Sequence, residues 1–104
     1  MPVTTIDSLK MFKSVTGGDK LAVVHFWATW APPCRVARPM FEELSNSGKS
    51  AEFYECNVDD CDDVASEVRA RTLSTFVLIR NGEELDRVLG GDPVELESVI
   101  KRHA

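Results

Sequence analysis

The feature that most constrains the fold is the apolar run from Leu21 to Trp27, LAVVHFW. Its Val and aromatic content favours a β-strand, and apolar side chains fall on both faces of that strand. Such a strand is typical of the centre of a sheet that is covered on both sides. The chain has 104 residues, 43% of them apolar, which is enough for one core. We therefore expect one domain over residues 1–104, built around this central strand.

The patterns on either side of this strand predict alternating strands and helices. The expected elements are strands at 3–6, 21–27, 51–58, 75–80 and 84–89, and helices at 8–16, 32–48, 59–71 and 93–104. The expected N-caps are Asp7 or Ser8 for the first helix, Asp59 or Asp60 for the third and Asp92 for the last. Asn81-Gly82 between the last two strands is the typical turn of a two-residue hairpin. The helix faces expected to point inward carry Val36, Met40, Phe41 and Leu44, and then Val94, Leu96, Val99 and Ile100. The order β-α-β-α-β-α-β-β-α predicts an α/β fold with a mixed sheet and helices on both faces.

Charge and cysteine content exclude several classes of function. A net charge of −5 argues against nucleic acid or an anionic membrane as partner, because both require basic patches. No run approaches the ~20 apolar residues that cross a bilayer. The chain has three cysteines, an odd number, and they do not have zinc-finger spacing. We expect no metal and no cofactor, and a reducing, cytoplasmic compartment. A trimmed organellar presequence would leave no trace in these residues.

The most informative stretch joins the end of the central strand to the next helix, where open α/β sheets tend to place their chemistry. It reads FWATWAPPCR, from Phe26 to Arg35. This stretch resembles the active-site motif of thioredoxins, whose Trp-Cys-Gly-Pro-Cys-Lys corresponds to Trp30-Ala31-Pro32-Pro33-Cys34-Arg35. The resemblance extends over nearly the whole chain, including Val58-Asp59-Asp60-Cys61, Thr75-Phe76 and Asn81-Gly82. It implies a thioredoxin fold.

The resemblance also implies four chemical features, of which this chain keeps one. The attacking cysteine of the family lies at a helix N-terminus, which lowers the pKa of its thiol, and here that position is Ala31. The resolving cysteine is present as Cys34. The buried aspartate of the central strand is replaced by His25, and the cis-proline that faces the motif is replaced by Ser74. An ordinary dithiol reductase is therefore not expected.

A second resemblance suggests what such a chain does instead. The strings His25-Phe26-Trp27-Ala28 and Trp30-Ala31-Pro32-Pro33-Cys34 are similar to the thioredoxin-like N-terminal domain of multidomain monothiol glutaredoxins. Those domains are thought to serve as docking modules, although they usually keep the cis-proline that Ser74 replaces here. Pro32-Pro33 followed by Arg35 also resembles tryparedoxins.

Three functional hypotheses follow. The first is a protein-binding, regulatory domain in redox homeostasis that holds a protein partner in the former substrate groove. That groove would be lined by Trp30, Ala31, Pro32, Pro33, Cys34, Leu73, Ser74, Thr75 and Gly91. The second is a monothiol redox protein that uses Cys34 with His25 as base. The third is a thioredoxin protein-disulfide oxidoreductase that carries a Cys-to-Ala substitution at residue 31.

Further expectations concern single residues. Cys34 is expected to be packed beneath the motif and chemically quiet, and His25 to be neutral, with one ring nitrogen bonded to backbone. The Leu73–Ser74 peptide is expected to be trans, because a cis bond before a residue other than proline costs about 3 kcal/mol. Cys56 and Trp27 are expected in the core. Cys61 is expected to be exposed at a helix start, where it would allow an intermolecular disulfide in an otherwise monomeric protein.

Overall fold

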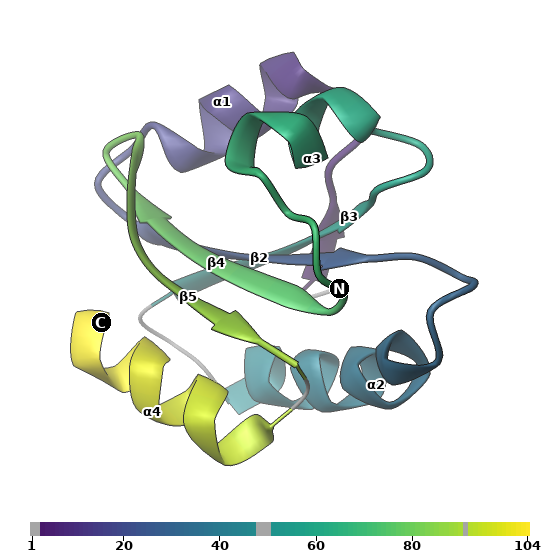
Figure 1. The fold of residues 1–104 in the computed structure, drawn as a ribbon. Coiled ribbons are helices and arrows are strands. Elements are labelled where there is room, and N and C mark those ends of the chain that lie inside the picture. Colours follow the sequence, from purple (N-terminus) through teal and green to yellow (C-terminus); the bar gives the residue numbers. More distant parts are fainter. Residues whose placement is uncertain (1–2, 48–50, 91) are drawn as a thin grey trace.

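The computed structural model describes residues 3–47, 51–90 and 92–104. The elements follow the predicted order (Figure 1). They are β1 (Val3–Thr5), α1 (Leu9–Thr16), β2 (Leu21–Trp27), α2 (Pro32–Ser47), β3 (Ala51–Asn57), α3 (Asp62–Val68), β4 (Thr75–Arg80), β5 (Glu83–Leu89) and α4 (Pro93–His103). The prediction of the α/β fold is confirmed, and most boundaries agree within a residue or two.

Helix α3 begins later than expected, because the chain turns before it. The backbone N–H groups of Asp60 and Cys61 both donate to the carbonyl of Asn57, at 3.1 and 3.0 Å. The N–H of Asp59 donates to the side-chain oxygen of Asn57 at 2.9 Å. These bonds form a turn at the acidic residues that sequence reasoning took as the helix cap. The helix therefore starts only at Asp62.

Strand β2 lies in the middle of the sheet, whose strand order is β1-β3-β2-β4-β5. It pairs parallel with β3 and antiparallel with β4. Helices α1 and α3 cover one face of the sheet, and α2 and α4 cover the other (Figure 1). The prediction of a central strand is therefore confirmed.

Two apolar clusters, one on each face of the sheet, make up most of the core. Ala22, Val24 and Phe26 of β2 belong to the cluster that includes Phe12 of α1 and Val64 of α3. Leu21 and Val23 of β2 belong to the cluster beneath α2 and α4. Because successive side chains of a strand point to opposite faces, both clusters require apolar residues from β2. This explains why the run LAVVHFW lacks alternation.

Two apolar residues that were expected to point inward are exposed. Val36 of α2 and Val94 of α4 each have 74% of their surface accessible. In α2 the buried stripe runs through Cys34, Ala37 and Phe41, at helical spacings of three and four, so Val36 lies off it. Val94 lies similarly off the buried stripe of α4.

The local signals for turns and caps are confirmed. Asn81 and Gly82 have φ of 54° and 75°, the left-handed conformations that a two-residue hairpin turn requires. Ser8 accepts a hydrogen bond from the N–H of Met11, and Asp92 accepts one from the N–H of Val94. Within the described ranges no helix has the length and apolar character needed to cross a membrane.

Candidate functional site at the start of helix α2

The motif lies where β2 leads into α2. After Trp27 the chain makes a turn in which the N–H of Ala31 donates to the carbonyl of Ala28. Pro32 and Pro33 form the first turn of the helix, where a missing N–H has no cost. Cys34 follows, and its N–H donates to the carbonyl of Ala31 at 3.0 Å. Ala31 and Cys34 are both buried, Cys34 with only 1% of its surface accessible.

Three buried side chains from distant parts of the sequence are joined by hydrogen bonds. The Sγ of Cys34 lies 3.1 Å from the Oγ of Ser74, and that oxygen lies 2.9 Å from Nε2 of His25. His25 comes from β2, Cys34 from α2, and Ser74 from the residue before β4. The expected link between His25 and Cys34 therefore passes through the hydroxyl of Ser74. A serine in the position of the family proline is what makes this link possible.

The surroundings of His25 keep its ring neutral. The ring is buried and stacks on Phe76, with 4.3 Å between the ring centroids and 10° between the planes. Burial, and secondarily the positive charge of Arg38, lower the pKa of His25 to about 3. The prediction of a neutral histidine is supported, but its ring nitrogen bonds the Ser74 side chain and not backbone. Among the described residues, the other ring nitrogen, Nδ1, has no hydrogen-bond partner.

The expectation of a trans peptide between Leu73 and Ser74 is wrong, because this bond is cis. The sequence argument weighed the cost of the cis form without the contacts that surround Ser74. Its hydroxyl contacts both Cys34 and His25, and its carbonyl accepts from the N–H of Gly90 at 2.9 Å. Thr75 next to it is buried and donates from its hydroxyl to the carbonyl of Thr72. Tertiary contacts with Cys34, His25 and Gly90 thus hold this segment opposite the motif.

The residues expected to line a groove divide into an exposed set and a buried set. Trp30, with 66% of its surface accessible, Pro32 and Pro33 are exposed. Ala31, Cys34, Ser74 and Thr75 are buried and Leu73 is partly buried, so they lie beneath that surface. Gly91 lies outside the described residues.

Sequence reasoning missed Asp59, whose carboxylate accepts a hydrogen bond from the indole N–H of Trp30 at 2.8 Å. Its place in an acidic run concealed that role.

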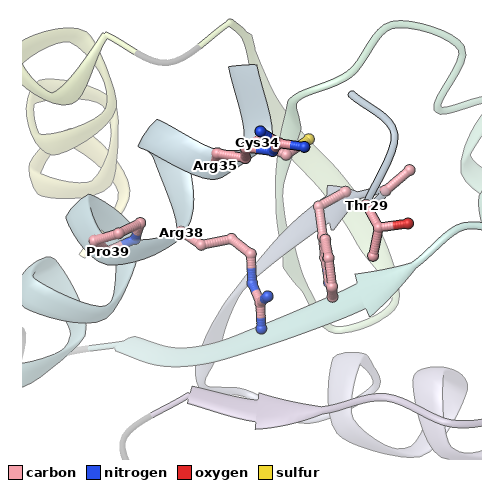
Figure 2. A pocket seen from close by; sticks show the side chains of 7 residues that line it. Thr29, Cys34, Arg35, Arg38 and Pro39 are labelled. Carbon is pink, nitrogen blue, oxygen red and sulfur yellow. The ribbon is translucent and has the colours of Figure 1, made fainter. Parts of the chain in front are cut away.

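An open pocket of about 470 Å³ lies beside the motif. It is lined by Trp27, Ala28, Thr29, Cys34, Arg35, Arg38 and Pro39. Figure 2 shows Arg38 and Thr29 on two sides of it, one from α2 and the other from the loop after β2. The guanidinium carbon of Arg38 lies 3.8 Å from the ring centroid of Trp27. Trp27, expected in the core, is half-buried: it packs on the cluster of Ala28, Ala31 and Cys34 and also lines this opening. Sequence reasoning missed this pocket, although Arg35 and Arg38 at spacing three share one side of a helix.

The other two cysteines belong to the core cluster beneath α1 and α3. Cys56 is buried as expected, and burial together with the neighbouring Cys61 raises the pKa of its thiol to about 12. The expectation that Cys61 is exposed is wrong: 4% of its surface is accessible, and its Sγ lies 3.6 Å from the carbonyl of Ile6. The turn before α3 directs this side chain inward. The hypothesis of an intermolecular disulfide through Cys61 required an exposed thiol, and this thiol is buried.

Comparison with known proteins agrees with this geometry. The family model described as Thioredoxin matches residues 3–102. A thioredoxin of Malassezia sympodialis is 43% identical over 104 residues, covering 98% of this chain and 99% of that protein. Thioredoxin-1 of Schizosaccharomyces pombe is 37% identical, covering 95% of this chain and 96% of that protein. The crystal structure of the Malassezia sympodialis thioredoxin superposes with a TM-score of 0.94 at 44% identity, over 97% of this chain and 90% of that one. The chain belongs to the thioredoxin family.

Proposed function

We propose that this chain is a protein-binding domain of cytoplasmic redox homeostasis and does not act as a dithiol disulfide reductase. The observation that carries the proposal is the pair Ala31 and Cys34 at the start of α2. Reduction of a disulfide by this route needs one thiolate to attack and a second thiol to resolve the mixed disulfide. Here the motif supplies one sulfur, and the remaining cysteines lie in the core cluster that α1 and α3 cover.

The exposed part of the motif supports a role in binding. Trp30 is exposed, and its bond to Asp59 restrains the indole. Pro32 and Pro33 beside it have few rotatable bonds. A restrained aromatic ring next to prolines loses little conformational entropy when a partner covers it, which is why such residues often dominate protein interfaces. Val36 adds exposed apolar surface on the next turn of α2.

A second candidate function is monothiol exchange at Cys34. The hydrogen-bonded series from Cys34 through Ser74 to His25 favours it, because a neutral imidazole can accept a proton through the hydroxyl. The lowered pKa of His25 weakens this candidate, since the protonated ring would stay buried among aromatic side chains. In this case oxidised glutathione would form a mixed disulfide with Cys34 and release one glutathione thiol. His25→Asn and Ser74→Ala would each slow that reaction, as mass spectrometry would record.

The absence of dithiol turnover is tested by dithiothreitol-driven reduction of insulin. The wild-type rate should equal that of dithiothreitol alone. The Ala31→Cys variant should exceed it by about tenfold or more, because it restores a thiol at the helix N-terminus. Its activity should stay partial, since His25 and Ser74 remain. Adding Cys34→Ser to that variant is the control and should abolish the gain. Wild-type turnover close to that of Ala31→Cys would refute the proposal.

Binding is tested separately, by titrating the protein with extended peptides that lack cysteine. The indole N–H signals of Trp30 and Trp27 in NMR spectra report on the surface and on the pocket. We expect the Trp30 signal to move, and Trp30→Ala to weaken binding about tenfold, as loss of a central aromatic contact does. Lys13→Ala, an exposed change on α1, should leave binding unchanged. Equal affinities of the two variants would contradict docking at Trp30.

A further inference from the structure

The pocket beside the motif has a chemical character that the proposed function does not use. Its polar side chains come from Thr29, Cys34, Arg35 and Arg38, and no acidic residue is among those that line it. Each of these groups can donate a hydrogen bond, and two are permanently charged. The chain has a net charge of −5, but the two arginines give this opening a positive charge. Such a pocket favours an anionic acceptor.

The two arginines are held differently. Arg38 lies over the Trp27 ring and forms an ion pair with Glu55, with 2.9 Å between Nη2 and Oε2. That pair fixes its position and offsets part of its charge. Arg35 is exposed and has no hydrogen bond or ion pair with any residue that the structure describes. The pocket therefore combines a fixed guanidinium in its wall with one at its rim that is free to bind.

Trp27 lines the same pocket as both arginines. Its indole nitrogen is buried and has no hydrogen-bond partner among the described residues, so the ring serves as a wall of the pocket and not as an exposed donor. The two guanidinium groups and the hydroxyl of Thr29 suit a carboxylate, whose two oxygens accept several hydrogen bonds at once.

We propose that this pocket binds the side-chain carboxylate of an aspartate or glutamate in the protein segment that docks across Trp30, Pro32 and Pro33. This inference rests on the proposed function and names the partner as an acidic segment. Asp59, which accepts the hydrogen bond of the Trp30 indole, and Asp60 are both exposed. Their charge disfavours an acidic residue beside them, so the segment places its carboxylate at the arginines of α2.

The test uses two cysteine-free peptides with apolar flanks, one with a central glutamate and one with glutamine in its place. Dissociation constants are measured with the full chain from the indole N–H signals of Trp27 and Trp30. The glutamate peptide should bind about fivefold more tightly at low ionic strength, the usual gain from a charge-assisted contact near a surface. It alone should move the Trp27 signal. High salt should reduce the difference.

Matched variants locate the effect. Arg35→Gln should abolish the preference for glutamate, because it removes the free cation without breaking any contact. Lys13→Gln makes the same change of charge on α1, which covers the other face of the sheet (Figure 1), and should leave the preference intact. If Lys13→Gln acts as strongly as Arg35→Gln, the attraction is nonspecific and the inference is wrong.

Other outcomes separate this inference from the proposed function. Equal binding of the two peptides, with Trp30→Ala weakening both, would leave the docking function intact and refute the acidic segment. Binding of neither peptide would refute both. If glutarate alone moved the Trp27 signal as strongly as the glutamate peptide at equal concentration, the pocket would be a site for small carboxylates, and the assignment to a protein segment would be refuted.

Discussion

The molecule buries cysteine side chains in two regions that have similar exposure but different neighbours. Cys34 at the start of α2 contacts the hydroxyl of Ser74 and borders an open pocket. Cys56 of β3 and Cys61, just before α3, lie in the apolar cluster with Ile6 and Val64. All three side chains are almost fully buried. Burial alone therefore does not distinguish the two regions; the hydroxyl of Ser74 beside Cys34 and the adjacent opening do.

The largest difference between the two regions should appear in alkylation. Iodoacetamide at about pH 8 should modify Cys34 first, because only an opening of the motif is needed. Cys56, whose thiol pKa is raised to about 12, should react at least about a hundredfold more slowly than in urea, because its cluster must unfold first. Mass spectrometry of timed digests measures the order.

The pKa of the Cys61 thiol is also raised, mainly by burial. In this experiment Cys61 should therefore react slowly, as Cys56 does. Denatured protein is the control, in which all three cysteines should react at similar rates. Modification of Cys61 before Cys34 in the native state would invert the comparison. It would also restore the sequence-based expectation that Cys61 is the more accessible thiol.

Serine substitution should lower the free energy of unfolding by different amounts in the two regions. Cys56→Ser places a hydroxyl among apolar side chains and should lower the free energy of unfolding by about 2–3 kcal/mol. Cys34→Ser should cost about 1 kcal/mol or less, because its hydroxyl can bond Ser74. Urea denaturation of both variants measures the difference. Equal losses would mean that the hydroxyl of Ser74 does not make the Cys34 site polar.

The smallest expected effect is a change in the free energy of unfolding with pH, caused by His25 in the region around Cys34. His25 has a pKa of about 3 in the folded protein and near 6.5 when unfolded, so below about pH 6.5 the unfolded chain binds the extra proton. Stability from this group is complete above that pH and falls as the pH decreases toward 3. Between about pH 6 and pH 5 the loss should be about 1 kcal/mol.

His25→Asn is the comparison for that measurement, because asparagine does not titrate and the carboxylates contribute equally to both proteins. Urea denaturation across the pH range should show the advantage of wild type over His25→Asn shrinking as the pH falls. A constant difference would mean that the histidine is accessible to protons in the folded state, which would favour the monothiol candidate.

Local patterns in the sequence were sufficient for the elements that shape the site. The bounds of β2 and β4 agree with those predicted, because apolar runs of strand length end at clear turn signals. The hairpin at Asn81-Gly82 and the cap at Asp92 also agree, since each depends on the conformation of a few adjacent residues. Where the expectations for Cys61, Val36 and Val94 were wrong, the outcome depended on how a helix or turn rotates against the sheet. Helical periodicity specifies which residues share a face, but not which of two neighbouring faces is buried.

The sequence by itself determined the family, the alanine at position 31 of the motif, and the place of Cys34 in the first turn of the helix after a central strand. These follow from a contiguous motif and from short-range periodicity. Only the tertiary structure decided that Ser74 joins Cys34 to His25, that Asp59 restrains Trp30, and that Arg38 lies over Trp27 beside an open pocket. The residues in the first two of these contacts are 29 to 49 positions apart in the sequence. Whether such residues meet depends on how strands pair and how helices pack, which no local pattern specifies.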